Sequence, residues 1–92
     1  MARLDAGEVD RRLEGSTWRR EGDVLVRDLR CPDFAAAMAL VNRVADEAER
    51  SNHHPDILVH GWNNVRLTLS THSEGGITEA DLRLAAAIDA LA

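Results

Sequence analysis

The sequence has 92 residues, which is enough for one domain and too few for two. Hydrophobic residues make up 45% of the chain and charged residues 29%, so the composition excludes an intrinsically disordered protein and predicts a single globular domain over residues 1–92. The net charge of −5 and the scattered basic residues argue against a nucleic-acid partner, and the 11 basic residues are all arginine, which excludes a Schiff-base lysine.

No window of the sequence is apolar enough for a membrane span, and the first residues lack the apolar segment of a secretory signal. The single cysteine, Cys31, excludes an internal disulfide and is typical of a reducing compartment. We therefore expect a cytoplasmic protein with no membrane partner. Because Cys31 precedes a predicted helix, the helix dipole favours its thiolate, although a small apolar residue at the start of a helix is the simpler interpretation.

The N-terminal third of the chain predicts a helix and a hairpin. A short helix over residues 5–13 is indicated by an Asp followed three residues later by Glu8, the spacing of a capped helix start. Residues 18–20 and 24–29 are two predicted strands, and the Gly-containing turn at 21–23 joins them as an antiparallel hairpin.

The clearest helix begins after Asp33, a residue type that caps helices well, and ends near Ser51 because Pro55 disfavours helical backbone at the residue before it. Apolar side chains recur along this helix at alternating spacings of four and three residues, which predicts one buried stripe. That stripe consists of Phe34, Met38, Val41, Ala45 and Ala48.

The C-terminal third predicts two more strands and a helix. Residues 57–59 are a short apolar run, and residues 65–69 alternate between apolar and polar side chains as a half-buried strand does. Thr78 and Asp81 have the spacing of a capping box, so the last helix is expected over 79–91. The predicted fold is therefore α+β, with a four-stranded antiparallel sheet and three helices packed on one face in the order α-β-β-α-β-β-α.

The last predicted helix is apolar on nearly all sides, since only Arg83 and Asp89 interrupt its Leu, Ile and Ala residues. Such a helix needs cover on more than one side, which a small domain does not offer. We therefore expect a homodimer or homotetramer whose contact surface includes this helix. The alternative is that short alanine side chains tolerate exposure to solvent.

Three histidines, His53, His54 and His72, lie near predicted ends of a helix or a strand, where side chains from different elements converge. Histidine gives and takes protons near neutral pH, so these three are candidate acid–base groups. Glu49 precedes His53 by four residues, the helical spacing at which it could orient that ring. Each histidine alone is weak evidence, because a histidine at a helix end more often caps the helix.

Three further residues have a structural interpretation beside a functional one. Trp62 is either a core residue or the wall of a pocket, since indole rings stack on flat heterocycles. Asp81 accepts hydrogen bonds at a helix start and can serve a site at the same time. His60 is isolated beside Gly61, and we interpret it as structural.

In combination, these residues resemble the pterin-4a-carbinolamine dehydratase family. The matching segments are Glu49-Arg50-Ser51-Asn52-His53-His54-Pro55, Trp62-Asn63-Asn64-Val65, Leu67-Thr68-Leu69-Ser70-Thr71-His72 and Asp81. The family signature is an acidic residue, three further residues, His-His-Pro, an aromatic residue, Thr-His at the end of the next strand and an Asp that opens the last helix. The resemblance covers nearly the whole chain. One departure is that six residues separate Pro55 from Trp62, where the family usually has five.

The resemblance implies a hydro-lyase that removes water from a 4a-hydroxytetrahydropterin to give quinonoid dihydropterin, after a pterin-dependent aromatic amino acid hydroxylase has turned over. It implies acid–base catalysis without a metal or another cofactor. The implied catalytic residues are His53, His54 and His72, and the implied substrate-binding residues are Pro55, Asp81, Trp62, Glu49 and Thr71. Our hypothesis is that His53 and His72 form the acid–base pair and that His54 mainly holds the ligand.

Two alternatives stay open. Glu49, His53 and His72 could supply three ligands to a catalytic zinc ion, although adjacent histidines before a proline chelate poorly and no cysteine or second carboxylate is near. The chain could also be a protein-interaction or dimer-stabilising module of the same fold, as some relatives in this family are. The retained histidines favour the enzyme.

Overall fold

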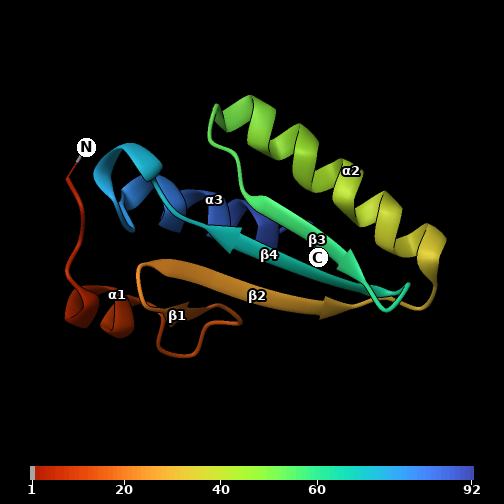
Figure 1. The fold of residues 1–92 in the computed structure, drawn as a ribbon, viewed down its shortest axis with the longest axis horizontal. Helices are drawn as coiled ribbons and strands as arrows, with labels where there is room; N and C mark the ends of the chain where they lie inside the picture. Colours follow the sequence, from red (N-terminus) through yellow and green to blue (C-terminus); the bar gives the residue numbers. More distant parts are fainter. Residues whose placement is uncertain (1) are drawn as a thin grey trace.

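The order of the elements confirms the predicted α+β fold. The computed structural model describes residues 2–92 (Figure 1). Its elements are α1 (Ala6–Arg12), β1 (Arg19–Glu21), β2 (Val24–Arg30), α2 (Phe34–Ser51), β3 (Asp56–His60), β4 (Asn64–Leu69), the 3₁₀ turn η1 (His72–Glu74) and α3 (Glu79–Asp89). None of the helices within these residues has the length and apolar character to cross a membrane.

The four strands form one antiparallel sheet in the order β1-β2-β4-β3. β4 is a central strand, and its register pairs Leu69 with Leu25 of β2 and Val65 with Val59 of β3. Side chains alternate between the two faces of a strand, so Val65, Leu67 and Leu69 are all fully buried on the same face. This is the half-buried strand that the alternation predicted.

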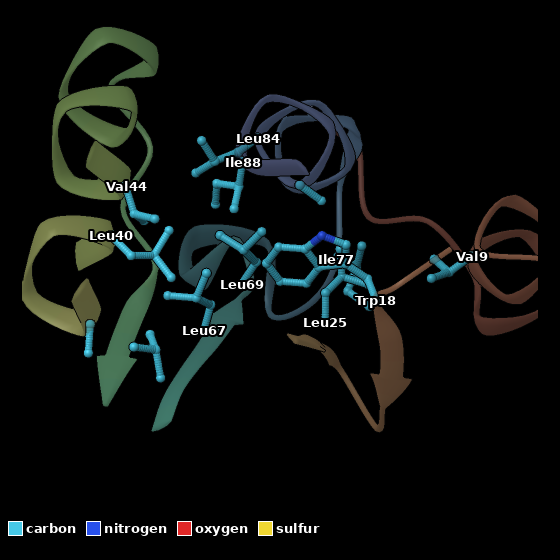
Figure 2. Close-up of a cluster of buried hydrophobic side chains, with 13 residues drawn as sticks. Val9, Trp18, Leu25, Leu40, Val44, Leu67, Leu69, Ile77, Leu84 and Ile88 are labelled. Carbon is cyan, nitrogen blue, oxygen red and sulfur yellow. The ribbon is translucent and has the colours of Figure 1, made fainter. Parts of the chain in front are cut away.

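The core lies between that face of the sheet and the helices α2 and α3 (Figure 2). From α2, Leu40 and Val44 enter this core. From α3, Leu84 and Ile88 do so. α1 packs beside β1 and reaches the same core through Val9. Two helices therefore cover the sheet, and the third closes its β1 side.

The buried stripe of α2 differs from the predicted one. The predicted stripe was Phe34, Met38, Val41, Ala45 and Ala48. The buried residues are Ala37, Leu40, Val44 and Ala48. Phe34 and Met38 are instead 54% and 37% exposed. The prediction was confirmed for Ala48 and wrong for Phe34 and Met38. Two neighbouring stripes repeat at spacings of three and four residues, and the position of α2 over the sheet decides which of them faces inward.

The last helix is buried more fully inside the chain than its composition suggested. Leu84, Ala85 and Ile88 are at most 4% exposed, because α3 packs against both the sheet and α2. Within residues 2–92, the large apolar side chains that stay exposed lie elsewhere: Phe34, Met38, Leu58 and Trp62. The exposed large apolar side chains therefore lie on α2 and the β3–β4 hairpin rather than on α3.

Trp18 is a core residue with one polar contact. It is 3% exposed, and its indole Nε1 donates a hydrogen bond to Asp89 Oδ1 at the end of α3, at 2.8 Å. Arg27 of β2 donates to the same oxygen from Nη1 at 2.5 Å. These two bonds fix the end of α3 to the sheet.

Asp28, on the open face of β2, connects two arginines. The Arg66 guanidinium donates a hydrogen bond to Asp28 Oδ1 at 2.8 Å, and Arg19 Nη2 lies 3.1 Å from Oδ2. The hydrogen bond from Arg66 has the largest effect on the pKa of Asp28, and together these bonds hold that pKa below its usual value. The ionised carboxylate therefore stabilises the folded chain above the pKa that Asp28 has when unfolded. This contribution is lost as the pH falls through the lower pKa of the folded state.

We expect the difference in unfolding free energy between wild type and D28N to be largest near neutral pH and to disappear at low pH. It should stay at or below about 1 kcal/mol, because the Asp28 side chain is 42% exposed and solvent screens such pairs. Urea unfolding at a series of pH values measures it. D46N is the matched control, since Asp46 on α2 is exposed and has no ion pair in the part of the chain described. The same pH dependence in both variants would contradict the assignment.

Candidate active site

α2 ends in a reversal of the chain that takes the histidine pair out of the helix. Asn52 adopts left-handed backbone (φ 50°), and its N–H donates to the Glu49 carbonyl at 3.2 Å. The His53 N–H donates to the Ala48 carbonyl at 3.1 Å. This pair of bonds is a Schellman cap, in which Asn tolerates the left-handed position. Because Pro55 follows two residues later, the histidines occupy a short, fixed corner before β3.

His53 hydrogen-bonds the carboxylate of Asp81, which lies in the first turn of α3. Its Nε2 lies 2.5 Å from Asp81 Oδ1, and the two side chains are 17% and 0% exposed. Glu49, which the sequence suggested as the partner of His53, bonds to Nε2 of His54 instead. That prediction was wrong because it extended helical spacing as far as His53, whereas the chain already reverses at Asn52.

The buried Asp81 carboxylate accepts hydrogen bonds on both oxygens. Oδ2 accepts from the Thr78 N–H and from the Thr71 hydroxyl, each at 2.9 Å. Oδ1 faces His53. These partners can all donate, so an ionised carboxylate is satisfied here despite its burial. The N-terminal turn of α3 adds a favourable helix dipole. The Asp81 carboxylate is therefore held in one orientation.

This orientation decides which nitrogen of His53 is available to a ligand. Since an ionised carboxylate can only accept, Nε2 of His53 carries a proton, and Nδ1 carries the lone pair of the neutral ring. A buried carboxylate in this position also stabilises the ring once it has accepted a second proton. His53 is therefore suited to take up a proton at Nδ1 and to release it again.

His54 and Glu49 form an exposed pair at the same corner. Their side chains are 57% and 77% exposed. Exposed pairs of this kind contribute little to stability, because water competes for both partners. His54 can therefore exchange its contact with Glu49 for a contact with a ligand at small cost.

His72 starts the 3₁₀ turn that follows β4. The turn is closed at its base by Thr71, whose N–H donates to the Gly76 carbonyl at 2.8 Å. Gly75 ends the turn with left-handed backbone (φ 69°) and donates its N–H to the His72 carbonyl at 3.1 Å. Arg3 holds the turn from the N-terminal segment by donating from Nη1 to the Gly75 carbonyl at 3.1 Å. The exposed His72 side chain thus belongs to a short, closed turn.

The histidine corner and the His72 turn line one open cleft. Its volume is about 250 Å³, and it is lined by Asn52, His53, His54, Ser70, Thr71, His72 and Ser73. The structure therefore brings together the three predicted histidines and Thr71, with Asp81 bonded to His53 and Pro55 next in the chain after His54. A cleft lined by imidazoles and hydroxyls can hold a small polar ring and exchange protons with it.

Trp62 lies at the other end of β3 from the histidine corner. It occupies the turn between β3 and β4, where His60 pairs with Asn64, whereas Asp56 next to the corner pairs with Thr68. Five strand residues separate the two ends, about 17 Å of extended chain. The Trp62 side chain is 61% exposed. Within one chain, Trp62 is therefore neither a core residue nor a wall of this cleft.

Thr78 is a site residue to which the sequence assigned only a structural role. Its side chain is fully buried, and its Oγ1 lies 2.7 Å from Thr71 Oγ1. The capping box of Thr78 and Asp81 is present as predicted. The capping pattern gives no sign that the same carboxylate bonds His53, because that residue lies 28 positions earlier in the chain.

The ligand set considered for zinc is not assembled. Glu49 contacts His54, and Nε2 of His53 bonds Asp81. Throughout residues 2–92, no group of three or more His, Cys, Asp or Glu side chains has the spacing to hold a metal ion. The side chains that the structure describes therefore give the zinc alternative no ligand set.

Sequence comparisons match the chain over almost its full length. The profile of the family described as "Pterin 4 alpha carbinolamine dehydratase" matches residues 2–91. A protein of Thermomicrobium roseum named "Putative pterin-4-alpha-carbinolamine dehydratase" is 50% identical over 93 residues, which cover 100% of this chain and 99% of its own. A protein of the same name from Nocardia farcinica is 53% identical over 75 residues, which cover 82% of this chain and 78% of its own.

Two solved structures are similar to this fold. A Brucella melitensis protein described as a transcriptional coactivator/pterin dehydratase has a TM-score of 0.89 and 32% identity, over 98% of each chain. A pterin dehydratase-like protein described as a RuBisCO assembly factor in the alpha-carboxysome has a TM-score of 0.68 and 29% identity, over 82% of this chain and 88% of its own. The same fold is thus found in proteins with different described roles.

Proposed function

The chain belongs to the pterin carbinolamine dehydratase family, and on this premise we propose that it is a hydro-lyase that removes water from a 4a-hydroxytetrahydropterin. The product is quinonoid dihydropterin, and the reaction serves the recycling of tetrahydrobiopterin. One observation carries the proposal: His53, His54 and His72 meet in one cleft, with a buried carboxylate bonded to His53. The reaction changes no oxidation state, so acid–base groups suffice for it.

The mechanism needs one proton transfer at each of two substrate atoms. The C4a–O bond breaks as the departing hydroxyl group is protonated, N5 loses its proton, and a C4a=N5 double bond forms. His53 has its lone pair at Nδ1 and a carboxylate that stabilises its protonated ring, so it acts as the base at N5. His72 lines the same cleft from the opposite segment and, within residues 2–92, contacts no carboxylate that would hold it as a base, so it acts as the acid at the hydroxyl group.

The remaining site residues bind the substrate rather than transfer protons. His54 mainly holds the pterin, and Glu49 supports His54 through their hydrogen bond. Pro55 keeps the corner stiff, and Thr71 lines the cleft beside His72. Trp62 is not assigned to the site of its own chain, because it lies at the far end of β3.

Pterin binding should be visible in the histidine side chains. Adding a stable dihydropterin to ¹⁵N-histidine-labelled protein should shift the ring signals of the three histidines in the cleft. His60 is an internal control, because it ends β3 near Trp62 and should keep its shift. A shift confined to His60, or none at all with saturating ligand, would contradict the assignment of the cleft.

The second candidate function is a protein-interaction module. The observation that favours it is the fold shared with a described RuBisCO assembly factor. The two candidates differ in one measurement, the decay of 4a-hydroxytetrahydropterin absorbance with increasing amounts of the protein. A rate that rises in proportion to protein concentration supports the dehydratase. A rate equal to spontaneous dehydration at every concentration supports the interaction module.

We also propose that the chain forms a homodimer or homotetramer in the cytoplasm. Support for the assembly comes from the exposed Phe34 and Met38 on α2 and the exposed Leu58 on β3, which is an outer strand with one unpaired edge. Support for the compartment comes from the unpaired thiol of Cys31. Light scattering at micromolar concentration tests the assembly, and a monomer mass would contradict it.

A further inference from the structure

Two threonine hydroxyls lie in contact at the cleft, where Thr71 is a lining residue and Thr78 is buried behind it. Thr78 Oγ1 is 2.7 Å from Thr71 Oγ1, and Thr71 Oγ1 is 2.9 Å from Asp81 Oδ2. Thr78 is fully buried and reaches His53 only through Thr71 and Asp81. Its hydroxyl is therefore out of reach of a ligand in the cleft, and any effect it has on catalysis must pass through other residues.

The direction of each hydrogen bond in this group is fixed. A hydroxyl has one proton, and the Asp81 carboxylate can only accept, so Thr71 donates its proton to Oδ2. Thr78 must then donate to Thr71, and Thr78 Oγ1 in turn accepts from the Ala80 N–H at 3.3 Å. The donors thus run in one direction from the start of α3 to Asp81, and such chains strengthen each member by polarisation.

We infer that Thr71 and Thr78 are positioning residues that, through Asp81, hold His53 in the tautomer with its proton on Nε2. Thr71 and the Thr78 N–H together satisfy Oδ2, so the other oxygen of the carboxylate points at His53. When the Thr71 proton is lost or turned away, Oδ2 is undersatisfied in a buried site and the carboxylate rotates to recover a donor. His53 then loses its fixed acceptor and populates both tautomers.

The tautomer does not depend on the proposed function, but the kinetic consequence rests on it. If His53 is the base at N5, a ring with its lone pair on the wrong nitrogen cannot react. Substitutions at Thr71 or Thr78 should therefore lower kcat. The effect should reach up to about 10²-fold, the cost typical of small misplacements in an active site.

The test is the ¹⁵N chemical shifts of the His53 ring in the free protein, measured for T71V, T78V and the rescuing variants T71S and T78S. Val has the shape of Thr without the hydroxyl, whereas Ser keeps the hydroxyl. We expect one Nε2–H tautomer in wild type and in both serine variants, and a mixture of tautomers in T71V. In T78V the share of the second tautomer should be smaller, because Thr71 keeps its bond to Oδ2 and loses only its own donor. T17V is the matched control, because the exposed Thr17 hydroxyl bonds Asp89, a residue outside this group.

T78V removes a capping residue of α3 and could prevent folding. T71V then still tests the inference, because Thr71 lies outside the capping box. Unchanged His53 shifts in folded T71V would overturn the inference. A mixture of tautomers in T71V, together with the single Nε2–H tautomer in T71S, supports the inference whether or not the wild type dehydrates a pterin. A wild type without dehydratase activity would therefore contradict the proposed function and leave the role of the hydroxyls standing.

Discussion

D81N should lower kcat by about 10²–10⁴ and leave the fold intact. Asn has the shape of Asp, but one of its two terminal groups is a donor. The position of Oδ2 must remain an oxygen, because the Thr71 hydroxyl and the Thr78 N–H both donate to it. The amide NH₂ then faces His53 and donates to Nε2, which moves the ring proton to Nδ1. His53 loses the lone pair with which it removes the proton from N5.

Steady-state kinetics with circular dichroism of the same samples measures this effect. D89N is the control: Asp89 lies at the other end of α3 and accepts from Trp18 and Arg27. It should lower thermal stability and leave kcat within about twofold, because it does not contact the cleft. Wild-type kcat in folded D81N would contradict the role of this carboxylate.

H72A should lower kcat by about 10²–10⁴ and change pterin binding far less. The His72 side chain is exposed and stands in a turn whose backbone bonds do not involve it, so its removal leaves the fold unchanged. The acid that protonates the departing hydroxyl group is lost, and water must replace it. The substrate still contacts the rest of the cleft.

The kcat of H72A is compared with its dissociation constant for a stable dihydropterin. H60A is the control for the loss of an exposed imidazole, since His60 lies near the far end of β3. Equal kcat for H72A and wild type would refute the role of His72. A large loss of binding with unchanged kcat would make His72 a binding residue instead.

The order of helices and strands along the chain could be predicted because it depends on local patterns. The alternation from Val65 to Leu69 and the cap at Asp33 each act within a few residues. The buried stripe of α2 could not be predicted in the same way. Its two candidate stripes, one with Met38 and one with Leu40, are equally periodic, and the choice depends on packing against the sheet.

The site was predictable to the extent that its residues are close in sequence. The corner at His53 follows from a helix that must stop before Pro55. The predicted partner of His53, Glu49, was wrong. The chain reverses at the left-handed Asn52, so the His53 ring bonds Asp81 on α3 instead. No local spacing indicates a contact between residues 28 positions apart, and the family resemblance named Asp81 without its partner.

Of the contacts that Thr78 makes with Asp81 and with Thr71, the sequence predicted only the local one. The capping box predicted that Thr78 and Asp81 interact at the start of α3, and they do. The contact with Thr71 depends on how the turn after β4 folds back, which the isolated pairing of Thr71 with Gly76 achieves. Residues that act through other residues therefore become visible only with the structure.

The most direct test follows the absorbance of 4a-hydroxytetrahydropterin with wild type, H60A and the H53A/H72A double variant at equal concentrations. Wild type and H60A should accelerate the decay in proportion to their concentration. The folded double variant, without the base and the acid, should leave it at the spontaneous rate. A wild type that does not exceed the spontaneous rate, or a double variant that matches wild type, would contradict histidine-catalysed dehydration in this cleft.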